Sequence, residues 1–460
     1  MIGDLKGVTS KLDYIAKDLG ADGIWLMPVM PSPTYHKYDI TDYYSIDPQY
    51  GTMEDFEELI AEAEKRDIKV MIDLVVNHTS NLHPWFSEAV DALWQNEDSE
   101  YIGYYNFTTE NPGQGYNKIT DKYYYECRFV SGMPDLNLDE PSVRSEIMKI
   151  AQFWLEKGAG GFRLDAVTSF YTGSTTKNVE FLQWLCDGIR DLDSEAYIVG
   201  EVWADGGTIT NYYKSGIDSL FNFPFSQADG RITAALNTRR GDSFADALVK
   251  WNETIRAVNP KAADALFLSN HDNARSAGFL MRDISRQKMA AAMYLLAPGI
   301  PFIYYGEEIG MNGSGRDENK RLPMLWSSQS SEGMTFPPPG ATQSVTKIEG
   351  VLEQLADKDS LLNHYAQLLK IRNANPEIAR GEIAPVETGH TDIAAFGITH
   401  IDKTVYVFHN LSEEERSFEF SQDIYGKLKV RYTICSAGSG KASLRNDKLT
   451  LPPFSSTVVR

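Results

Sequence analysis

Continuous apolar segments alternate with amphipathic segments of helical period along most of the chain. Apolar residues that recur three and four positions apart predict helices, and short apolar runs bounded by turn residues predict buried strands. The expected helices cover residues 7–20, 52–67, 141–158, 178–193, 211–216, 242–258, 284–299 and 361–376. The expected strands cover residues 23–29, 69–76, 161–167, 197–203, 219–225, 265–272 and 301–308.

Strands that are apolar throughout, each preceded by a helix, predict a parallel sheet covered by helices. The seven expected strands are one fewer than a (β/α)8 barrel contains. An open doubly wound sheet is the alternative, but no glycine-rich phosphate loop follows a first strand, as it commonly does in that fold. The pattern therefore favours the barrel.

Two regions interrupt this alternation. Residues 79–135 are rich in Tyr, Asn and Gly and are long for a loop, which predicts a small domain inserted after the third barrel strand. Residues 377–460 contain short alternating stretches such as TVYVFHNL and KVRYTI, which predict an all-β C-terminal domain. The expected catalytic barrel then comprises residues 1–78 and 136–376.

Composition and charge narrow the class of ligand. A net charge of −20 argues against non-specific binding to nucleic acid or to an anionic membrane, and it suits a neutral ligand. The 24 tyrosines and 8 tryptophans offer flat faces on which sugars or bases can stack. Three scattered cysteines without a CxxC spacing indicate neither a disulfide framework nor a thiolate zinc site. No apolar run approaches the length of a membrane span.

The segment GFRLDAV, residues 161–167, carries Arg163 and Asp165 in an otherwise apolar strand. Residues two apart share one face of a strand, so these two side chains should point the same way. A buried charged pair is costly unless it is paired or used, and it is either a structural ion pair or part of a site. In both cases we predict that Arg163 lies within hydrogen-bond reach of Asp165.

Charged and amide side chains gather at the C-terminal ends of four expected strands. They are Asp73, Asn77 and His78; Arg163 and Asp165; Glu201; and Asn270, His271 and Asp272. Barrels carry their active sites on this face, and four clusters on one rim are hard to explain as packing. Metal ligation is the rival, but HxH and HExxH spacings are absent and an arginine would repel a cation. An arginine that keeps one carboxylate ionised, near a second carboxylate that keeps its proton, is the arrangement needed for retaining glycoside hydrolysis.

The motifs DLVVNH, GFRLDAV, GEVW and SNHD, in this order, resemble the four conserved blocks of the α-amylase family of retaining glycoside hydrolases, glycoside hydrolase family 13. MPDLN, residues 133–137, is similar to the fifth block of members between oligo-1,6-glucosidases and neopullulanases. The resemblance covers nearly the whole chain and implies a (β/α)8 TIM barrel, an inserted domain after strand 3 and a C-terminal β-sandwich. The first barrel strand should precede IGDLKG, a stretch typical of a turn, so we expect that strand to be missing from a truncated N-terminus.

The resemblance also implies the catalytic roles. Asp165 would be the nucleophile that forms a β-glucosyl-enzyme, and Arg163 would hold it ionised. Glu201 would be the general acid and then the base that activates water, with its carboxyl about 5–5.5 Å from that of Asp165. Asp272 would be the third carboxylate, which grips the 2- and 3-hydroxyls of the sugar.

Further residues would bind the same sugar at subsite −1. His78 and His271 would donate or accept hydrogen bonds, and Tyr38 would stack against the ring. Arg316 would reach this subsite as well, or else form an ion pair with Asp317 or another neighbour. Asp73 and Asn77 are expected to support the site.

Departures from the family pattern bear on specificity and on calcium. Tyr35 stands where exo-acting α-glucosidases usually carry an aspartate that caps the non-reducing end, so it favours an open cleft and internal cleavage. Ala166 resembles members that cut α-1,4 bonds. Thr168 and Ser169 stand where many secreted α-amylases have a Lys-His pair whose histidine carbonyl helps to bind calcium, and of the family's other calcium loop, an Asp-rich turn just before GIGDLKG, only MIGDLKG remains. We expect no cofactor for the chemistry, and the usual sites for a structural calcium ion look incomplete.

We therefore expect an endo-acting, retaining α-1,4-glucan hydrolase of the α-amylase type that acts on starch and maltooligosaccharides. The alternatives are a 4-α-glucanotransferase, an α-glucosidase or neopullulanase-like enzyme with the same residues, and a catalytically silent glycan-binding protein. The expected partner is an α-glucan or maltooligosaccharide, with no nucleic acid and no membrane span. We expect a monomer with an extracellular or cell-surface location rather than a cytoplasmic one.

Overall fold

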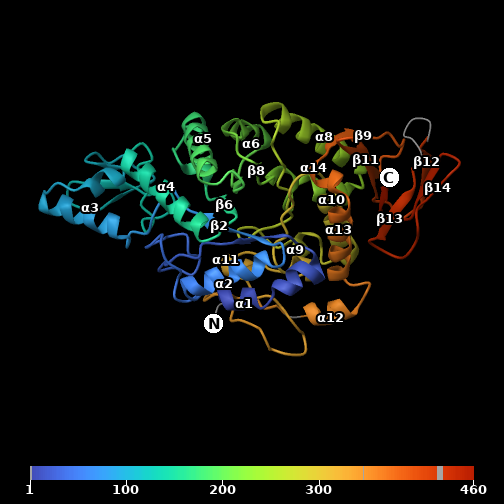
Figure 1. The fold of residues 1–460 in the computed structure, drawn as a ribbon, viewed down its shortest axis with the longest axis horizontal. Helices are drawn as coiled ribbons and strands as arrows, with labels where there is room; N and C mark the ends of the chain where they lie inside the picture. Colours follow the sequence, from blue (N-terminus) through green and yellow to red (C-terminus); the bar gives the residue numbers. More distant parts are fainter. Residues whose placement is uncertain (1–2, 346, 422–427) are drawn as a thin grey trace. The chain divides into compact units, whose positions relative to one another are not determined.

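The computed structural model describes residues 3–345, 347–421 and 428–460 (Figure 1). These residues form two compact units. The first unit holds residues 3–16 and 21–220, and the second holds residues 17–20 and 221–460. No helix of the described residues is long and apolar enough to cross a membrane.

The first unit contains a five-stranded parallel sheet in the order β1-β2-β6-β7-β8. Its strands are β1 Gly23–Leu26, β2 Lys69–Leu74, β6 Gly161–Leu164, β7 Tyr197–Gly200 and β8 Ser219–Leu220. β6 is buried at every position and β2 at all but its first, as expected for a sheet covered on both faces. In the register of the sheet Asp73 lies opposite Arg163, so two of the predicted polar residues are neighbours across strands.

The helices expected at 52–67, 141–158 and 178–193 are present in the first unit, whereas the one expected at 7–20 is divided into two short helices and the one expected at 211–216 begins earlier, at Gly206. The α-helices are α1 Leu5–Thr9, α2 Met53–Glu64, α3 Pro84–Gln95, α4 Pro141–Glu156, α5 Thr175–Leu192 and α6 Gly206–Tyr212, and the 3-10 helices are η2 Glu100–Tyr104, η3 Val167–Ser169 and η4 Tyr213–Ser215. The π-helix η1 Tyr14–Leu19 follows α1, and its residues 17–19 are counted with the second unit. Thr52 caps α2 as expected, because its side chain accepts from the Asp55 amide and the Asp55 side chain accepts from the Thr52 amide. The turn expected at IGDLKG is wrong in its described part, since Asp4 caps helix α1; Met1 and Ile2 lie outside the described residues.

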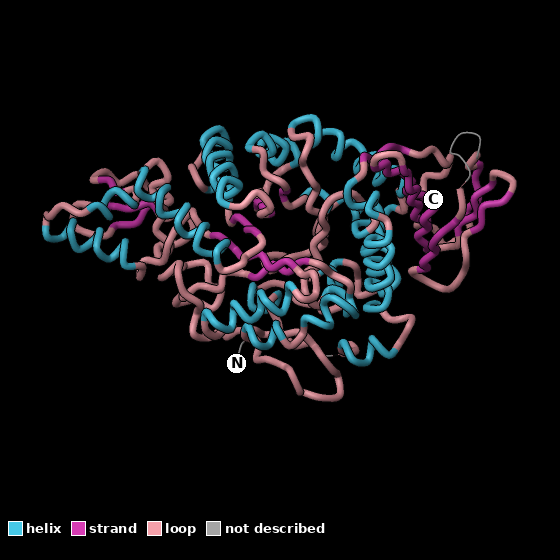
Figure 2. The backbone as a smooth tube through the Cα atoms, viewed as in Figure 1, coloured by secondary structure: helices cyan, strands magenta, loops and turns pink. Residues whose placement is uncertain are grey.

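The segment between β2 and α4 carries a small antiparallel sheet in the order β3-β5-β4. Its strands are β3 Phe107–Thr108, β4 Tyr116–Lys118 and β5 Tyr124–Glu126. Helix α3 lies beside this sheet (Figure 2). The Phe86 ring of the helix packs edge-on against the Tyr125 ring of β5, with ring centroids 5.0 Å apart. A bridge between His78 and Asp135 joins the two ends of the segment. The tyrosines that mark this stretch in the sequence thus include part of its core.

The second unit begins with helices. They are α7 Arg231–Thr238, α8 Gly241–Val258, α9 Ser276–Phe279, α10 Ile284–Leu295, α11 Asp317–Lys320, α12 Val351–Ala356, α13 Leu361–Ala374 and α14 Pro376–Arg380, with turns η5 Phe223–Phe225 and η6 Glu307–Ile309. The strands expected at 265–272 and 301–308 appear only as single bridges, between Phe221 and Ala265 and between Phe267 and Phe302. Five of the seven expected strands are therefore regular in the described residues.

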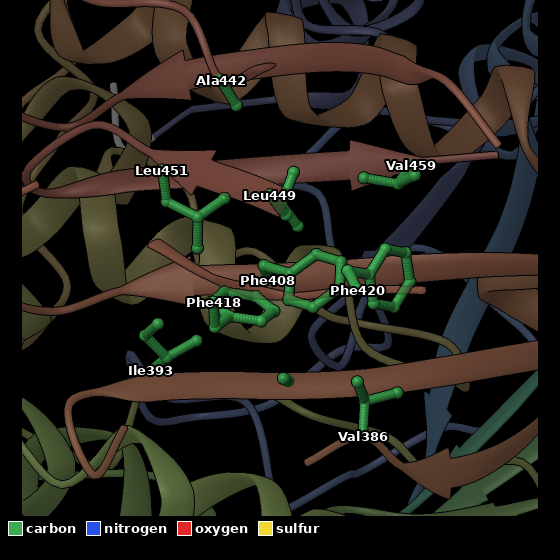
Figure 3. Close-up of a cluster of buried hydrophobic side chains, with 10 residues drawn as sticks. Val386, Ile393, Phe408, Phe418, Phe420, Ala442, Leu449, Leu451 and Val459 are labelled. Atoms are coloured by element: carbon green, nitrogen blue, oxygen red, sulfur yellow. The ribbon is translucent and has the colours of Figure 1, made fainter. Parts of the chain in front are cut away.

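The C-terminal part of the second unit is a β-sandwich. One sheet has the order β13-β16-β11-β10-β9 and the other the order β12-β15-β14. The strands are β9 Glu382–Pro385, β10 Ile393–His400, β11 Lys403–Asn410, β12 Arg416–Glu419, β13 Val430–Cys435, β14 Ser443–Arg445, β15 Lys448–Leu451 and β16 Ser455–Val459. The ring of Phe408 lies 5.6 Å from that of Phe418 and 5.2 Å from that of Phe420 in the buried cluster of the sandwich (Figure 3).

Candidate active site

Arg163 is the central residue of the candidate site in the first unit. Its Nη1 donates to Asp165 Oδ1 at 2.6 Å, which confirms the contact predicted from their spacing. The same nitrogen donates to the two carboxylate oxygens of Asp73 at 2.9 and 3.1 Å. Nη2 forms an ion pair with Glu201 Oε2 at 2.9 Å. One fully buried guanidinium thus joins three carboxylates.

The electrostatics of this group keep the arginine charged. Burial lowers the pKa of the guanidinium, but Asp73, Glu201, Tyr38 and Asp165 together hold that pKa well above its usual value. Burial raises the pKa of Asp73, and Arg163 opposes that rise. The sequence pattern predicted only the contact of Arg163 with Asp165, and the structure adds contacts with Asp73 and Glu201. Arg163 contacts both candidate catalytic carboxylates, so it does not by itself distinguish acid from nucleophile.

Backbone hydrogen bonds hold Glu201 against the end of β6. The Glu201 amide donates to the Leu164 carbonyl at 3.0 Å, and the Val167 amide donates to the Glu201 carbonyl at 3.1 Å. Ala166, directly after Asp165, has a left-handed backbone with φ +47°, and its amide donates to Glu201 Oε2 at 3.3 Å. Such a conformation is costly for alanine and persists where surrounding contacts enforce it. The turn therefore sets Asp165 and Glu201 side by side.

Tyr38 and His78 lie in the same unit. The Tyr38 hydroxyl donates to Asp73 Oδ2 at 3.0 Å and accepts from Arg163 Nη1 at 3.3 Å. His78 is buried, and burial lowers its pKa to about 4, so its ring is neutral near pH 7 and acts as a hydrogen-bonding group rather than as a cation. Its Nδ1 lies 3.2 Å from Asn77 Nδ2. The structure thus joins four of the predicted residues, Tyr38, Arg163, Asp165 and Glu201, in one group, with His78 in the same unit.

In the second unit, Asp272 is held from several directions. Arg321 Nη2 donates to Asp272 Oδ1 at 2.8 Å, and His271 Nε2 lies 3.1 Å from Asp272 Oδ2. The Asp272 amide donates to Asn270 Oδ1 at 2.9 Å, and Lys320 Nζ donates to the Asp272 carbonyl at 2.6 Å. His271 and Asp272 are thus neighbours, as their adjacent positions require, and both are fixed by residues of the same unit.

Arg316 shows the ion pair that the sequence left open as an alternative. Its side chain is 60% exposed and its Nε lies 3.3 Å from Glu318 Oε2. Arg321 is the arginine that reaches Asp272, and sequence reasoning missed it. The only signal in the sequence was that both arginines occur in the basic stretch GRDENKR, which does not say which of them turns inward.

A structural calcium ion stays an expectation from the sequence. No group of three or more His, Cys, Asp or Glu side chains in the described part of the chain is arranged to hold a metal ion. The Thr168 carbonyl, next to Ser169, accepts from Asn178 Nδ2 at 3.0 Å. No step of the chemistry proposed below runs through a metal ion.

Comparisons with known proteins agree with this arrangement. Residues 1–381 match the alpha amylase catalytic domain, and residues 393–458 match the C-terminal domain of alpha-amylase SusG. Alpha-amylase 3 of Dictyoglomus thermophilum is 39% identical over 473 residues, which cover 100% of this chain and 89% of that protein. A 4-alpha-glucanotransferase of Thermotoga neapolitana is 30% identical over 444 residues, which cover 91% of this chain and 93% of that protein.

Among solved structures, Eubacterium rectale Amy13B superposes with a TM-score of 0.94 at 42% identity, covering 99% of this chain and 91% of that one. An alpha-amylase from H. orenii superposes with a TM-score of 0.87 at 36% identity, covering 99% and 94%. The chain belongs to the α-amylase family of glycoside hydrolases, with a TIM-barrel catalytic domain followed by a C-terminal β-sandwich.

Proposed function

We propose that this glycoside hydrolase is an endo-acting, retaining α-amylase that cuts α-1,4 bonds in starch and maltooligosaccharides. One observation carries the proposal: the Arg163 guanidinium lies 2.6 Å from Asp165 and 2.9 Å from Glu201. Two carboxylates close enough to share one cation are what a double-displacement reaction at one anomeric carbon requires. Asp165 and Glu201 also lie in motifs that resemble the conserved blocks of amylases, which supports the same function.

In the proposed reaction, a carboxylate oxygen of Asp165 attacks the anomeric carbon while the bond from that carbon to the leaving sugar oxygen breaks. Glu201 gives its proton to that oxygen. Glu201 then takes a proton from water, whose oxygen attacks the anomeric carbon and breaks the ester bond to Asp165. A separation of about 5–5.5 Å between the two carboxyls stays a prediction of this mechanism.

The remaining residues would bind and orient the sugar. Asp272 is proposed to accept hydrogen bonds from two sugar hydroxyls, and its contacts with Arg321 and His271 keep its carboxylate in place for that purpose. His78 is neutral near pH 7 and suits a hydrogen bond to an uncharged hydroxyl. Tyr38 is proposed as the platform on which the ring of the sugar rests.

Cleavage inside the chain is supported by Tyr35, which replaces the end-capping aspartate of exo-acting relatives, and by the names of the amylases that the chain resembles. A maltoheptaoside blocked at its non-reducing end tests the proposal. An endo-acting enzyme releases shorter oligosaccharides from the blocked substrate, and Asp165→Asn should abolish that release. No cleavage of the blocked substrate, together with glucose release from unblocked maltoheptaose, would refute endo action.

A 4-α-glucanotransferase is the second candidate, favoured by the relative of that name that is 30% identical over nearly the whole chain. The same glucosyl-enzyme can be attacked by a sugar hydroxyl in place of water. Incubation with maltotriose separates the two: products longer than the substrate with little free glucose indicate transfer, and shorter products alone indicate hydrolysis. Product analysis by chromatography over time measures the ratio.

A further inference from the structure

Lys37 combines a buried charge with an unfavourable backbone. Its φ is +67°, in the left-handed region that favours glycine, and the residue is only 3% exposed. Its Nζ donates to Asp47 Oδ2 at 2.6 Å, to Gln49 Oε1 at 3.0 Å and to the Ser32 carbonyl at 3.3 Å. Asp47 is itself 4% exposed, so this is a buried ion pair with three hydrogen bonds at the ammonium.

The residues on either side of Lys37 carry aromatic rings. The rings of His36 and Tyr38 are stacked, with centroids 6.2 Å apart and planes at 29°. The Tyr35 ring meets the His36 ring edge-on at 5.7 Å. The left-handed turn at Lys37 lets the flanking rings pair with each other while the lysine side chain points into the protein. A continuous aromatic strip, Tyr35, His36 and Tyr38, results.

A glycine would satisfy the backbone at this position without strain. A lysine is unfavourable there unless its side chain compensates, and outliers of this kind cluster at functional sites. The compensation is the buried ammonium, which ties the loop to Asp47 and Ser32. The Asp47 carboxylate binds the loop a second time, since Oδ2 accepts from the Ser32 amide at 3.3 Å. The anchor therefore fixes both ends of the segment from Ser32 to Lys37.

We propose that Lys37 is a positioning residue, whose ion pair with Asp47 holds Tyr38 in register with the catalytic group. Tyr38 is the next residue in the chain, and its hydroxyl contacts Asp73 at 3.0 Å and Arg163 at 3.3 Å. A displaced Tyr38 would change both the sugar platform and one partner of the arginine that binds the nucleophile. This inference rests on the proposed role of Tyr38 in sugar binding.

A double-mutant cycle tests the inference. Lys37→Met removes the ammonium and keeps the strained backbone, and Lys37→Gly removes the ammonium and relieves the strain. Each is combined with Tyr38→Ala, and kcat and KM are measured on maltoheptaose. Misplacement of a substrate-positioning group by about 1 Å costs up to roughly 100-fold, so we expect each Lys37 variant to lose about 10-fold or more in kcat/KM.

The double variants should be no worse than Tyr38→Ala alone, because Lys37 acts through Tyr38 and effects that share one route are not additive. Lys65→Met is the control: this exposed lysine pairs with Glu62 at 2.5 Å on a helix surface, and its loss should leave kcat/KM unchanged. If Lys37→Met does not fold, Lys37→Gly and Asp47→Asn carry the same cycle, and we expect the same non-additivity.

A wild-type value of kcat/KM in Lys37→Gly would overturn the inference. A kcat/KM loss in the double variants equal to the product of the two single losses would also overturn it, because a general loss of folded enzyme acts independently of Tyr38→Ala. The proposed function is tested by the wild-type enzyme in the same assay. A wild-type enzyme without activity on any α-glucan would overturn both proposals. An active enzyme in which the kcat/KM losses of the Lys37 and Tyr38 substitutions multiply would overturn the role of Lys37 alone.

Discussion

Replacing Arg163 with methionine should destabilise the protein strongly. The change keeps much of the apolar stem but leaves Asp73, which is 0% exposed, and Asp165 and Glu201, each 8% exposed, without their common cation. Removing one partner of a buried ion pair costs about 3–5 kcal/mol, because the other charge stays buried and uncompensated. The arginine has three carboxylate partners, but proton uptake by the carboxyls limits the cost of leaving them unpaired. We therefore expect the free energy of unfolding at about pH 8 to fall by about 3–5 kcal/mol.

The loss should depend on pH in a defined direction. Burial already raises the pKa of Asp73 against the effect of Arg163, and removal of the arginine raises that pKa further. A carboxyl whose pKa is higher in the folded than in the unfolded protein stabilises the fold at low pH, and this contribution is lost as pH rises through the folded pKa. The difference between Arg163→Met and wild type should therefore be smaller at about pH 5 than at about pH 8.

Urea unfolding followed by tryptophan fluorescence at both pH values measures the effect. Arg144→Met is the matched control, since Arg144 Nε donates to the Leu138 carbonyl at 2.6 Å and its guanidinium lies 5.0 Å from the Trp184 ring, while the carboxylate of Asp139 is 3.9 Å away and mostly exposed. The control loses packing and two hydrogen bonds, to the Leu138 carbonyl and the Tyr171 hydroxyl, but leaves no buried carboxylate unpaired, so its loss of stability should be about the same at both pH values. A loss below about 1 kcal/mol for Arg163→Met, or an equal loss at both pH values, would refute the assignment of Arg163 as the counter-charge.

Three further changes test other parts of the structure. Arg321→Met should lower kcat/KM by roughly 10-fold or more, because Asp272 loses its 2.8 Å contact, whereas the exposed Arg316→Met should change it by less than about 2-fold in the same steady-state assay. Burial raises the pKa of Glu307 from 4.5 to about 7, so the stabilisation that this carboxyl gives the folded protein is full at acid pH and is lost as pH rises through 7. Glu307→Gln should therefore reduce the pH dependence of the unfolding free energy, measured with urea, by about 3 kcal/mol. Phe408→Ala should lower the stability of the C-terminal sandwich by about 3–5 kcal/mol through the cavity it leaves, measured by calorimetry.

Local patterns in the sequence were enough to predict those parts of the fold that depend on neighbours in the chain. Helix α2 begins at its predicted cap, Thr52, because capping needs only residues three positions apart. Apolar runs predicted burial correctly for β2, β6 and β7 but not for β1, which is only partly buried, and they do not decide whether a run pairs with its neighbours over several residues. Residues 265–271 are buried as expected, whereas residues 301–304 are only partly buried and Tyr305 is exposed, and both runs form single bridges rather than regular strands.

The contacts of the candidate site also fall into those that local sequence patterns predict and those that they do not. The contact between Arg163 and Asp165 follows from the two-residue period of a strand and was predictable. The contacts of Arg163 with Asp73 and Glu201 depend on the order β2-β6-β7, which no local pattern contains. Arg321 reaches Asp272 across 49 residues of sequence, and no periodic relation links these positions.

The shared arginine has a consequence for how the two catalytic carboxyls come to differ. A guanidinium within 2.9 Å of Glu201 favours the ionised carboxylate, whereas the first step of the proposed reaction needs Glu201 to carry a proton. The contact with Asp165, at 2.6 Å, favours the ionised form that the nucleophile needs. Bound glucan must therefore weaken the contact of Arg163 with Glu201 and keep the contact with Asp165, because the bridging sugar oxygen competes for Glu201.

A crystal structure of Asp165→Asn with maltoheptaose should show Arg163 farther than 2.9 Å from Glu201 and still hydrogen-bonded to residue 165. An unchanged distance to Glu201 would mean that its proton is supplied in spite of Arg163, and the division of roles would then have to come from other groups around Glu201, such as the Ala166 amide that donates to its Oε2.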